Sequence, residues 1–80
     1  MFKNEIPLPV VITSKDYIIT RIDNDVKHLF KFGFSNGVKI KKIFSNPFND
    51  PSAYEIMSTV IALRNQDAEK IFVIPSESNK

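Results

Sequence analysis

Few side chains in this sequence could perform acid–base or nucleophilic chemistry. His28 is the single histidine, and cysteine is absent. A histidine that acts as a general base needs a nucleophile or a carboxylate beside it, and the sequence specifies no such neighbour for His28. We therefore expect His28 to be a partly buried structural residue at the edge of the core. We also expect the chain to contain no catalytic residues and not to be an enzyme.

The acidic residues and the glycines do not form the sequence pattern of a metal or cofactor site either. Asp23-Asn24-Asp25 comes closest to a hard-metal loop, but it lacks the glycine and the distal glutamate of a calcium-binding loop. Turn formation explains this tripeptide, because Asn and Asp side chains bond to their own backbone. Gly33 and Gly37 are the two glycines of the chain, so no phosphate-binding glycine-rich loop can be formed. We expect no metal and no cofactor.

A basic stretch spans residues 27–42, which contain five lysines and no acidic residue. Four of these lysines would share one face of a hairpin: Lys27, Lys31, Lys39 and Lys41. Such a face can bind the phosphate backbone of a nucleic acid without recognising its bases. Alternatively, it can be a solvent-exposed face whose charges discourage aggregation. With a net charge of +2, non-specific nucleic-acid binding through these lysines is the alternative function.

Two phenylalanines in a proline-containing loop are the other candidate binding feature. Phe44 and Phe48 flank residues 45–47, which end in a proline. These aromatic side chains either close the core or form an apolar contact site for a partner. Arg64 interrupts an apolar stripe farther along the chain and could add a charged anchor. The predicted partner-binding residues are therefore Phe44, Phe48 and Arg64.

The elements that would position these residues are strands and one helix. β-Branched runs predict strands over residues 10–13 and 17–22, and alternating residues predict a hairpin over 26–42. A three-residue loop with a left-handed Gly37 would place the apolar side chains of that hairpin on one face. They are Phe30, Phe32, Phe34, Val38 and Ile40. We expect these phenylalanines to be core residues rather than a stacking surface for nucleic-acid bases.

The second half of the chain predicts one helix and one more strand. Asp50 and Pro51 form a helix start, and apolar residues then recur at helical spacing as far as Asn65. Residues 71–74 are apolar on both faces, so they predict an internal strand or an interface through which the protein self-associates. The fold class is α+β: a mostly antiparallel sheet of about five strands, in the order β-β-β-β-α-β, with one amphipathic helix across one face.

Length and composition place these elements in one domain and suggest where it works. We expect a single domain over residues 1–80, with an ordered core over 8–75 and a frayed tail over 76–80. The absence of cysteine, of a signal sequence and of a long apolar run indicates a cytoplasmic protein. The predicted function is a non-catalytic accessory module that binds an unidentified protein partner. By analogy, it would be a viral or mobile-element antagonist of a host protein.

Overall fold

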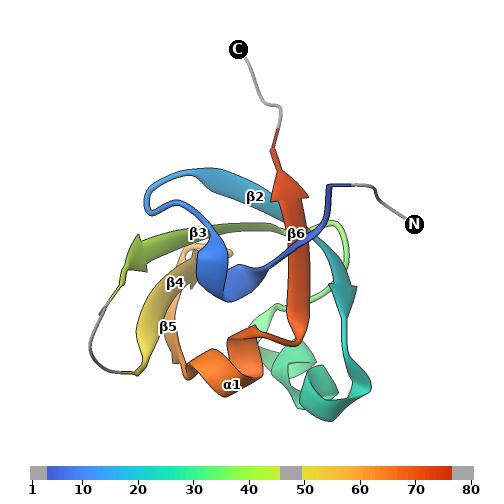
Figure 1. Ribbon diagram of the computed structural model, residues 1–80. Coiled ribbons are helices and arrows are strands. Elements are labelled where there is room, and N and C mark those ends of the chain that lie inside the picture. The colour runs from blue at the N-terminus through green and yellow to red at the C-terminus, as the bar shows by residue number, and fades with distance from the viewer. Residues whose placement is uncertain (1–3, 46–49, 77–80) are drawn as a thin grey trace.

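The described part of the chain forms a six-stranded antiparallel sheet in the order β1-β6-β2-β3-β4-β5 (Figure 1). The computed structural model describes residues 4–45 and 50–76. The strands are β1 (Ile6–Pro7), β2 (Asp16–Ile22), β3 (Lys39–Phe44), β4 (Ser52–Ile56), β5 (Thr59–Leu63) and β6 (Ile71–Pro75). Three short helical segments connect them: η1 (Leu8–Val10), η2 (Asn24–Phe32) and α1 (Asn65–Ala68).

The sheet curls around one apolar core. Ile71 and Val73 of β6 belong to the same buried cluster as Tyr54 and Ile56 of β4, although two other strands separate β6 from β4 in the sheet. A flat sheet could not bring these side chains together, so the strands must wrap around the core. Both 3-10 segments and α1 add buried residues to the cluster, namely Leu8, Val26, Leu29 and Ala68.

Two of the predicted strands are confirmed. The strand expected over residues 17–22 is β2, and alternate residues such as Tyr17 and Ile19 point into the core. The strand expected over residues 71–74 is β6, which lies inside the sheet between β1 and β2. β6 has neighbours on both sides, so the expectation of an internal strand is confirmed, and self-association through its outer face stays a prediction.

The predicted amphipathic helix beginning at Pro51 is wrong, because this segment is a β-hairpin of β4 and β5. Met57 and Ser58 form its two-residue turn with φ angles of 49° and 66°. Two left-handed residues in succession are typical of a type I′ hairpin turn. In β4 the buried residues alternate, with Ser52, Tyr54 and Ile56 inside. The sheet consequently has six strands rather than about five, and among the described residues no long helix covers a face.

The predicted hairpin over residues 26–42 is also wrong in its first half. Asp23 accepts a hydrogen bond from the Asp25 amide at 2.9 Å and begins the 3-10 segment η2, which ends at Gly33 with a φ of 103°. Phe30 and Phe32 are 71% and 51% exposed, so they are not core residues. The inward positions of Phe34 and Ile40 and the left-handed Gly37 are confirmed, although they belong to a loop and to β3.

The predicted strand over residues 10–13 is wrong as well. The short strand β1 lies earlier, and the chain then turns through η1, in which Pro9 occupies one of the first helical positions. Proline is well suited to that position because its missing amide hydrogen would be unsatisfied there in any case. Val11 donates from its amide to the Leu8 carbonyl at 3.2 Å, which closes this turn.

The observed hairpin and the helix expected from the sequence predict opposite effects on stability when Met57 and Ser58 are replaced. Replacing Met57-Ser58 with Asn-Gly should raise the free energy of unfolding by about 1 kcal/mol, since both new residues tolerate a positive φ. Chemical denaturation measures this change, with Met57→Ala as the control for the loss of side-chain contact with Gly33. A decrease of about 1 kcal/mol, the usual cost of a glycine inside a helix, would contradict the hairpin.

Candidate partner-binding surface

The structure does not gather the four predicted phosphate-binding lysines on one strand face. Lys27 and Lys31 are exposed on η2, whereas Lys39 and Lys41 lie on β3. Lys41 is in addition 3.7 Å from the carboxylate of Asp16. The predicted basic face depended on a strand over the first two lysines, and that segment is a 3-10 helix.

Two of the three predicted partner anchors, Phe44 and Arg64, lie toward one end of the sheet. Phe44 ends β3, is 58% exposed and pairs with Ala53, which in turn pairs with Ala62 of β5. Arg64 is exposed directly after β5 and precedes α1. Phe48 lies outside the described residues. Partner binding through Phe44 and Arg64 stays a prediction.

His28 is exposed on η2, so the expectation that it is partly buried is wrong. The expected turn chemistry of Asp23 is confirmed by its hydrogen bond to the Asp25 amide. Within residues 4–45 and 50–76, no group of three or more potential metal-ligating side chains is found. No helix in the described ranges is long and apolar enough to cross a membrane.

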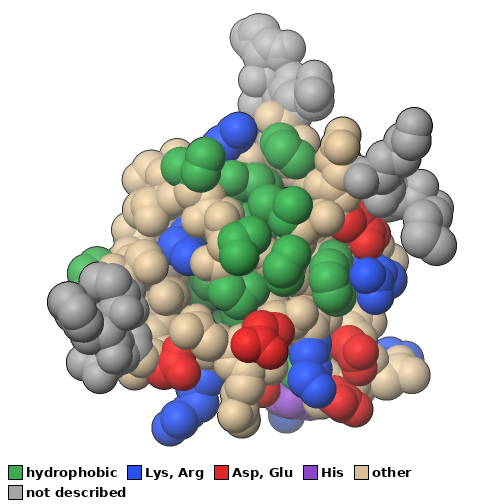
Figure 2. Space-filling view, viewed as in Figure 1, with side chains coloured by type: hydrophobic (Ala, Val, Ile, Leu, Met, Phe, Trp, Pro, Cys, Tyr) green, Lys and Arg blue, Asp and Glu red, His purple; other side chains and the backbone are tan. Residues whose placement is uncertain are grey.

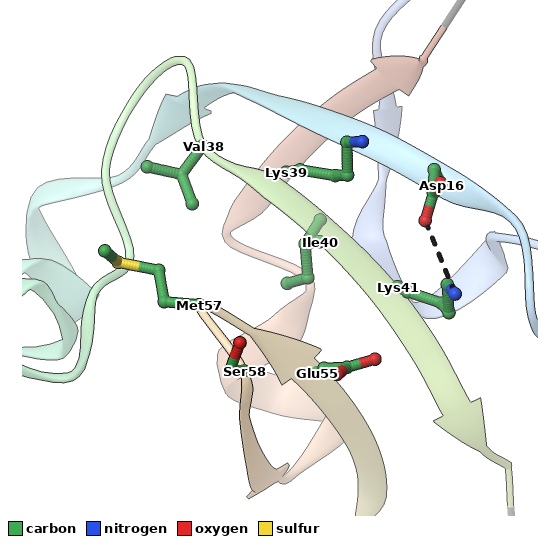
Figure 3. A pocket seen from close by; sticks show the side chains of 8 residues that line it. All are labelled: Asp16, Val38, Lys39, Ile40, Lys41, Glu55, Met57 and Ser58. Atoms are coloured by element: carbon green, nitrogen blue, oxygen red, sulfur yellow. Dashed lines mark ion pairs between the residues drawn. The ribbon is translucent and has the colours of Figure 1, made fainter. Parts of the chain in front are cut away.

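A shallow hollow of about 410 Å³ lies on the outer face of the sheet (Figure 3). Its walls come from β2, β3 and the residue before it, β4 and the turn after β4: Asp16, Val38, Lys39, Ile40, Lys41, Glu55, Met57 and Ser58. The dashed line in Figure 3 marks the ion pair between Asp16 and Lys41. The charges of Lys39 and Lys41 balance those of Asp16 and Glu55, so the hollow favours neither a cation nor an anion as its ligand.

Apolar side chains gather over η1 and β6 (Figure 2). Val10 and Ile12 are 61% and 63% exposed. The neighbouring proline and the outward residues of β6 are half-buried. We call this group the η1–β6 apolar surface, and its residues are Pro9, Val10, Ile12, Phe72 and Ile74. Exposed apolar clusters on soluble domains often mark interaction sites, so this surface is the strongest candidate for partner binding.

Contacts of η1 with the core and with Tyr17 explain why Val10 and Ile12 face outward. Leu8 and Val11 fill the core at 0% and 5% exposure, which leaves the intervening Val10 outside. The Ile12 amide donates to the hydroxyl oxygen of Tyr17 at 3.0 Å. Burial of Leu8 and Val11 contributes about 1.5–3 kcal/mol per side chain, enough to hold Val10 in its exposed position.

Lys42 also holds η1, because its buried ammonium donates to the carbonyl of Pro9 at 2.7 Å. The same nitrogen lies 5.8 Å from the centre of the Tyr54 ring. Burial lowers the pKa of Lys42 below its ordinary value, because the charged form is costly to desolvate. A polar interior contact therefore positions the exposed apolar surface.

Comparison with known proteins identifies the family. The sequence model of the FeoA domain matches residues 6–75. The chain belongs to the FeoA domain family. No curated protein matches this FeoA domain in sequence.

Solved structures agree with this assignment in fold. The FeoA-like protein from Clostridium acetobutylicum is 21% identical with a TM-score of 0.81, and the match covers 99% of this chain and 95% of that one. Iron(II) transport protein A from Clostridium thermocellum is 25% identical with a TM-score of 0.79, over 88% of this chain and 45% of that one. A manganese-dependent transcriptional repressor is 16% identical with a TM-score of 0.80, over 90% of this FeoA domain and 42% of the repressor.

These comparisons correct the predicted function. A viral or mobile-element antagonist of a host protein is wrong, because the chain is a FeoA domain and resembles FeoA structures over nearly its whole length. The alternative, non-specific nucleic-acid binding through a lysine-rich sheet face, is wrong because Lys27 and Lys31 lie on η2 and no such sheet face forms. Sequence reasoning also missed the η1–β6 apolar surface of this FeoA domain. The sequence feature that indicated this surface is the run from Ile6 to Ile12, in which every residue is apolar and Pro7 and Pro9 prevent a regular strand. A turn cannot bury all of these side chains in one core.

Among the described residues of the FeoA domain, one buried side-chain polar atom lacks a hydrogen-bond partner. The Tyr54 hydroxyl is buried, and no hydrogen bond of acceptable geometry reaches it in the described structure. Burial raises the pKa of Tyr54 to about 12, and the nearby Ser52 hydroxyl offsets part of this rise. Tyr17 is a matched control for Tyr54, because it is also buried but its hydroxyl accepts a hydrogen bond from the Ile12 amide.

The two tyrosines therefore predict opposite results for the same substitution. Tyr54→Phe should raise the free energy of unfolding by about 1 kcal/mol, because the buried hydroxyl that it removes has only the nearby Ser52 hydroxyl beside it, outside normal hydrogen-bond geometry. Tyr17→Phe should lower it by a similar amount, because the Ile12 amide would lose its acceptor. Urea denaturation of both variants at neutral pH measures the difference. Destabilisation by Tyr54→Phe would show that its hydroxyl is satisfied in solution.

The same pair predicts a dependence on alkaline pH. The pKa of Tyr54 is about 12 in the folded protein against an ordinary value of 10.0, so the unfolded chain loses this proton first. The wild-type protein should therefore lose stability as the pH rises from 10.0 towards 12. Tyr54→Phe should lack this part of the loss, whereas Tyr17→Phe should retain it. Equal alkaline losses in the wild-type and Tyr54→Phe proteins would contradict the burial of Tyr54.

Proposed function

We propose that this chain is an accessory domain of a ferrous iron transport system. It acts by binding another component of that system through the η1–β6 apolar surface. Membership of the FeoA domain family supports this proposal, as does the fold shared with iron(II) transport protein A from Clostridium thermocellum. The domain contributes a binding surface, and the chemistry of iron translocation belongs to its partner.

The observation that carries the proposal is the exposure of Val10 and Ile12 on a firmly held turn. Both side chains are more than half exposed, yet their backbone is fixed by buried neighbours and by the Tyr17 and Lys42 hydrogen bonds. A preformed apolar surface loses little conformational freedom on binding, which favours affinity. Figure 2 shows that charged side chains border the apolar cluster, as at the rim of a protein interface.

The proposed interface is neither a basic surface nor a metal site. Arg21 stacks on the Phe72 ring at 3.9 Å and pairs with Glu5 at 3.2 Å, so its charge is balanced beside the apolar surface. Thr20 also donates to the Glu5 carboxylate at 2.8 Å. The partner surface that fits is therefore apolar, with polar groups at its edge.

Ferrous iron uptake tests this proposal. A host strain that lacks the chain is complemented with the wild type, with the double variant Val10→Asp, Ile12→Asp, or with the control Met57→Asp. Met57 is 69% exposed and lies on another part of the surface, so the control adds a carboxylate at similar exposure. Two buried carboxylates should weaken partner binding at least 100-fold, or about 3 kcal/mol.

We expect normal uptake with the wild type and with Met57→Asp, and strongly reduced uptake with the double variant. Thermal unfolding of the purified proteins checks that each variant is folded. Normal uptake with a folded double variant would contradict binding through the η1–β6 apolar surface. Normal uptake in the strain without the chain, under ferrous iron limitation, would contradict the proposed function itself.

A further inference from the structure

Among the described residues, the sheet has two edges, and they differ sharply in protection. The β1 edge has two residues, and one of them is Pro7, which has no amide hydrogen to donate. Short strands and prolines are common protection against edge-to-edge pairing. The β5 edge has five residues without a charge or a proline, and its pairing with β4 has no register shift. β5 is therefore an unprotected strand edge.

The turn geometry shows which backbone groups of β5 are free. In a hairpin with a two-residue turn, the residues that flank the turn, here Ile56 and Thr59, form a hydrogen-bonded pair. Bonded pairs then alternate along the ladder, so Ile61 also bonds to β4. The amide and carbonyl groups of Val60 and Ala62 consequently point away from β4. Both residues are exposed, Val60 at 61%.

We propose that two copies of this chain pair through β5, antiparallel, around a two-fold axis at Ile61. In this register Val60 of each copy lies opposite Ala62 of the other. Each of these two pairs exchanges two backbone hydrogen bonds, as in any antiparallel ladder. The result is a continuous sheet across both copies, in which the four outward backbone groups at each edge are satisfied.

The structure favours a second copy as the occupant because β5 matches itself. The larger Val60 meets the smaller Ala62, and no charge within β5 opposes a like charge. Arg64 has an extended backbone, with φ −74° and ψ 151°, so the register continues to it. It then reaches the level of Ser58 in the other copy, and the two arginines lie at opposite ends of the interface.

The protected β1 edge makes this pairing stop at two copies. A β5-to-β1 contact would be heterologous and could continue into a filament, but Pro7 and the two-residue length of β1 oppose it. A β5-to-β5 contact uses the same edge on each copy and therefore closes. This inference does not rest on the proposed transport function. The pairing residues are also distinct from the η1–β6 apolar surface, so a dimer would carry two such surfaces for a bivalent partner.

Sedimentation equilibrium of the wild-type protein, from micromolar to millimolar concentration, tests the dimer. The average mass should rise from 9.2 kDa towards twice that value. Val60→Pro removes the outward amide donor without touching a β4–β5 hydrogen bond, and it should weaken dimerisation at least tenfold. Val60→Ser keeps that amide, so it should weaken dimerisation less than the proline variant does.

A charge exchange tests the register independently of the proline variant. The double variants Val60→Lys, Ala62→Lys and Val60→Glu, Ala62→Glu each place like charges opposite one another, so each should be monomeric. An equimolar mixture should form a mixed dimer, which native mass spectrometry detects. A wild-type protein that stays at 9.2 kDa overturns the proposal. So does a dimer that survives the lysine variant, or a mixture that stays monomeric although circular dichroism shows both variants folded.

Discussion

Strand β6 has hydrogen-bonded neighbours on both sides, and the rest of the structure depends on this placement. It pairs with β2 along its whole length and with β1 near its middle. Ile71 and Val73 are completely buried on its inner face. Because β1 is joined to β6, the chain must turn through η1 directly beside it. The exposed Val10 and Ile12 follow from that turn, so the candidate binding surface is a consequence of how the last strand is paired.

The interior accepts polar groups to hold this arrangement. Lys42 is 4% exposed and uses its ammonium to bond the Pro9 carbonyl, which fixes η1 from within the sheet. Burying a lysine costs free energy unless its charge is well compensated. The Tyr54 ring beside it provides part of that compensation through a cation–π contact. A small sheet domain has a thin core, and here part of that core serves to position a surface turn.

Sequence patterns predicted two strands correctly, β2 from a β-branched run and β6 from a run that is apolar on both faces. In the structure the inner residues of these strands, Tyr17 and Ile19 in β2 and Ile71 and Val73 in β6, alternate with less buried ones. The hairpin of β4 and β5 was missed because Met57 and Ser58 are unusual residues for a left-handed turn, and because Ile56, Val60 and Ile61 also fit a helical stripe. Local propensity could not separate these alternatives. The β-branched Thr59, Val60 and Ile61 were the signal in favour of a strand.

The candidate site was harder to predict than the fold, because exposure depends on which neighbours fill the core first. Phe30 and Phe32 look like core residues in the sequence, yet Val26 and Leu29 of the same segment occupy the interior and leave them outside. Along the run from Ile6 to Ile12, Leu8 and Val11 likewise take the buried positions. The sequence shows that such runs are apolar, but only the packing decides which members remain exposed.

Amide hydrogen exchange, followed residue by residue by NMR, tests the central role of β6 most directly. An internal strand with two buried side chains should open only with global unfolding. We therefore expect the amides of Val73 and Ile74 to be among the slowest to exchange, at the rate set by the global stability. The amides of β5 should exchange faster in dilute protein. Exchange at Val73 and Ile74 that is faster than at Tyr54 and Ile56 of β4 would contradict a structure organised around β6.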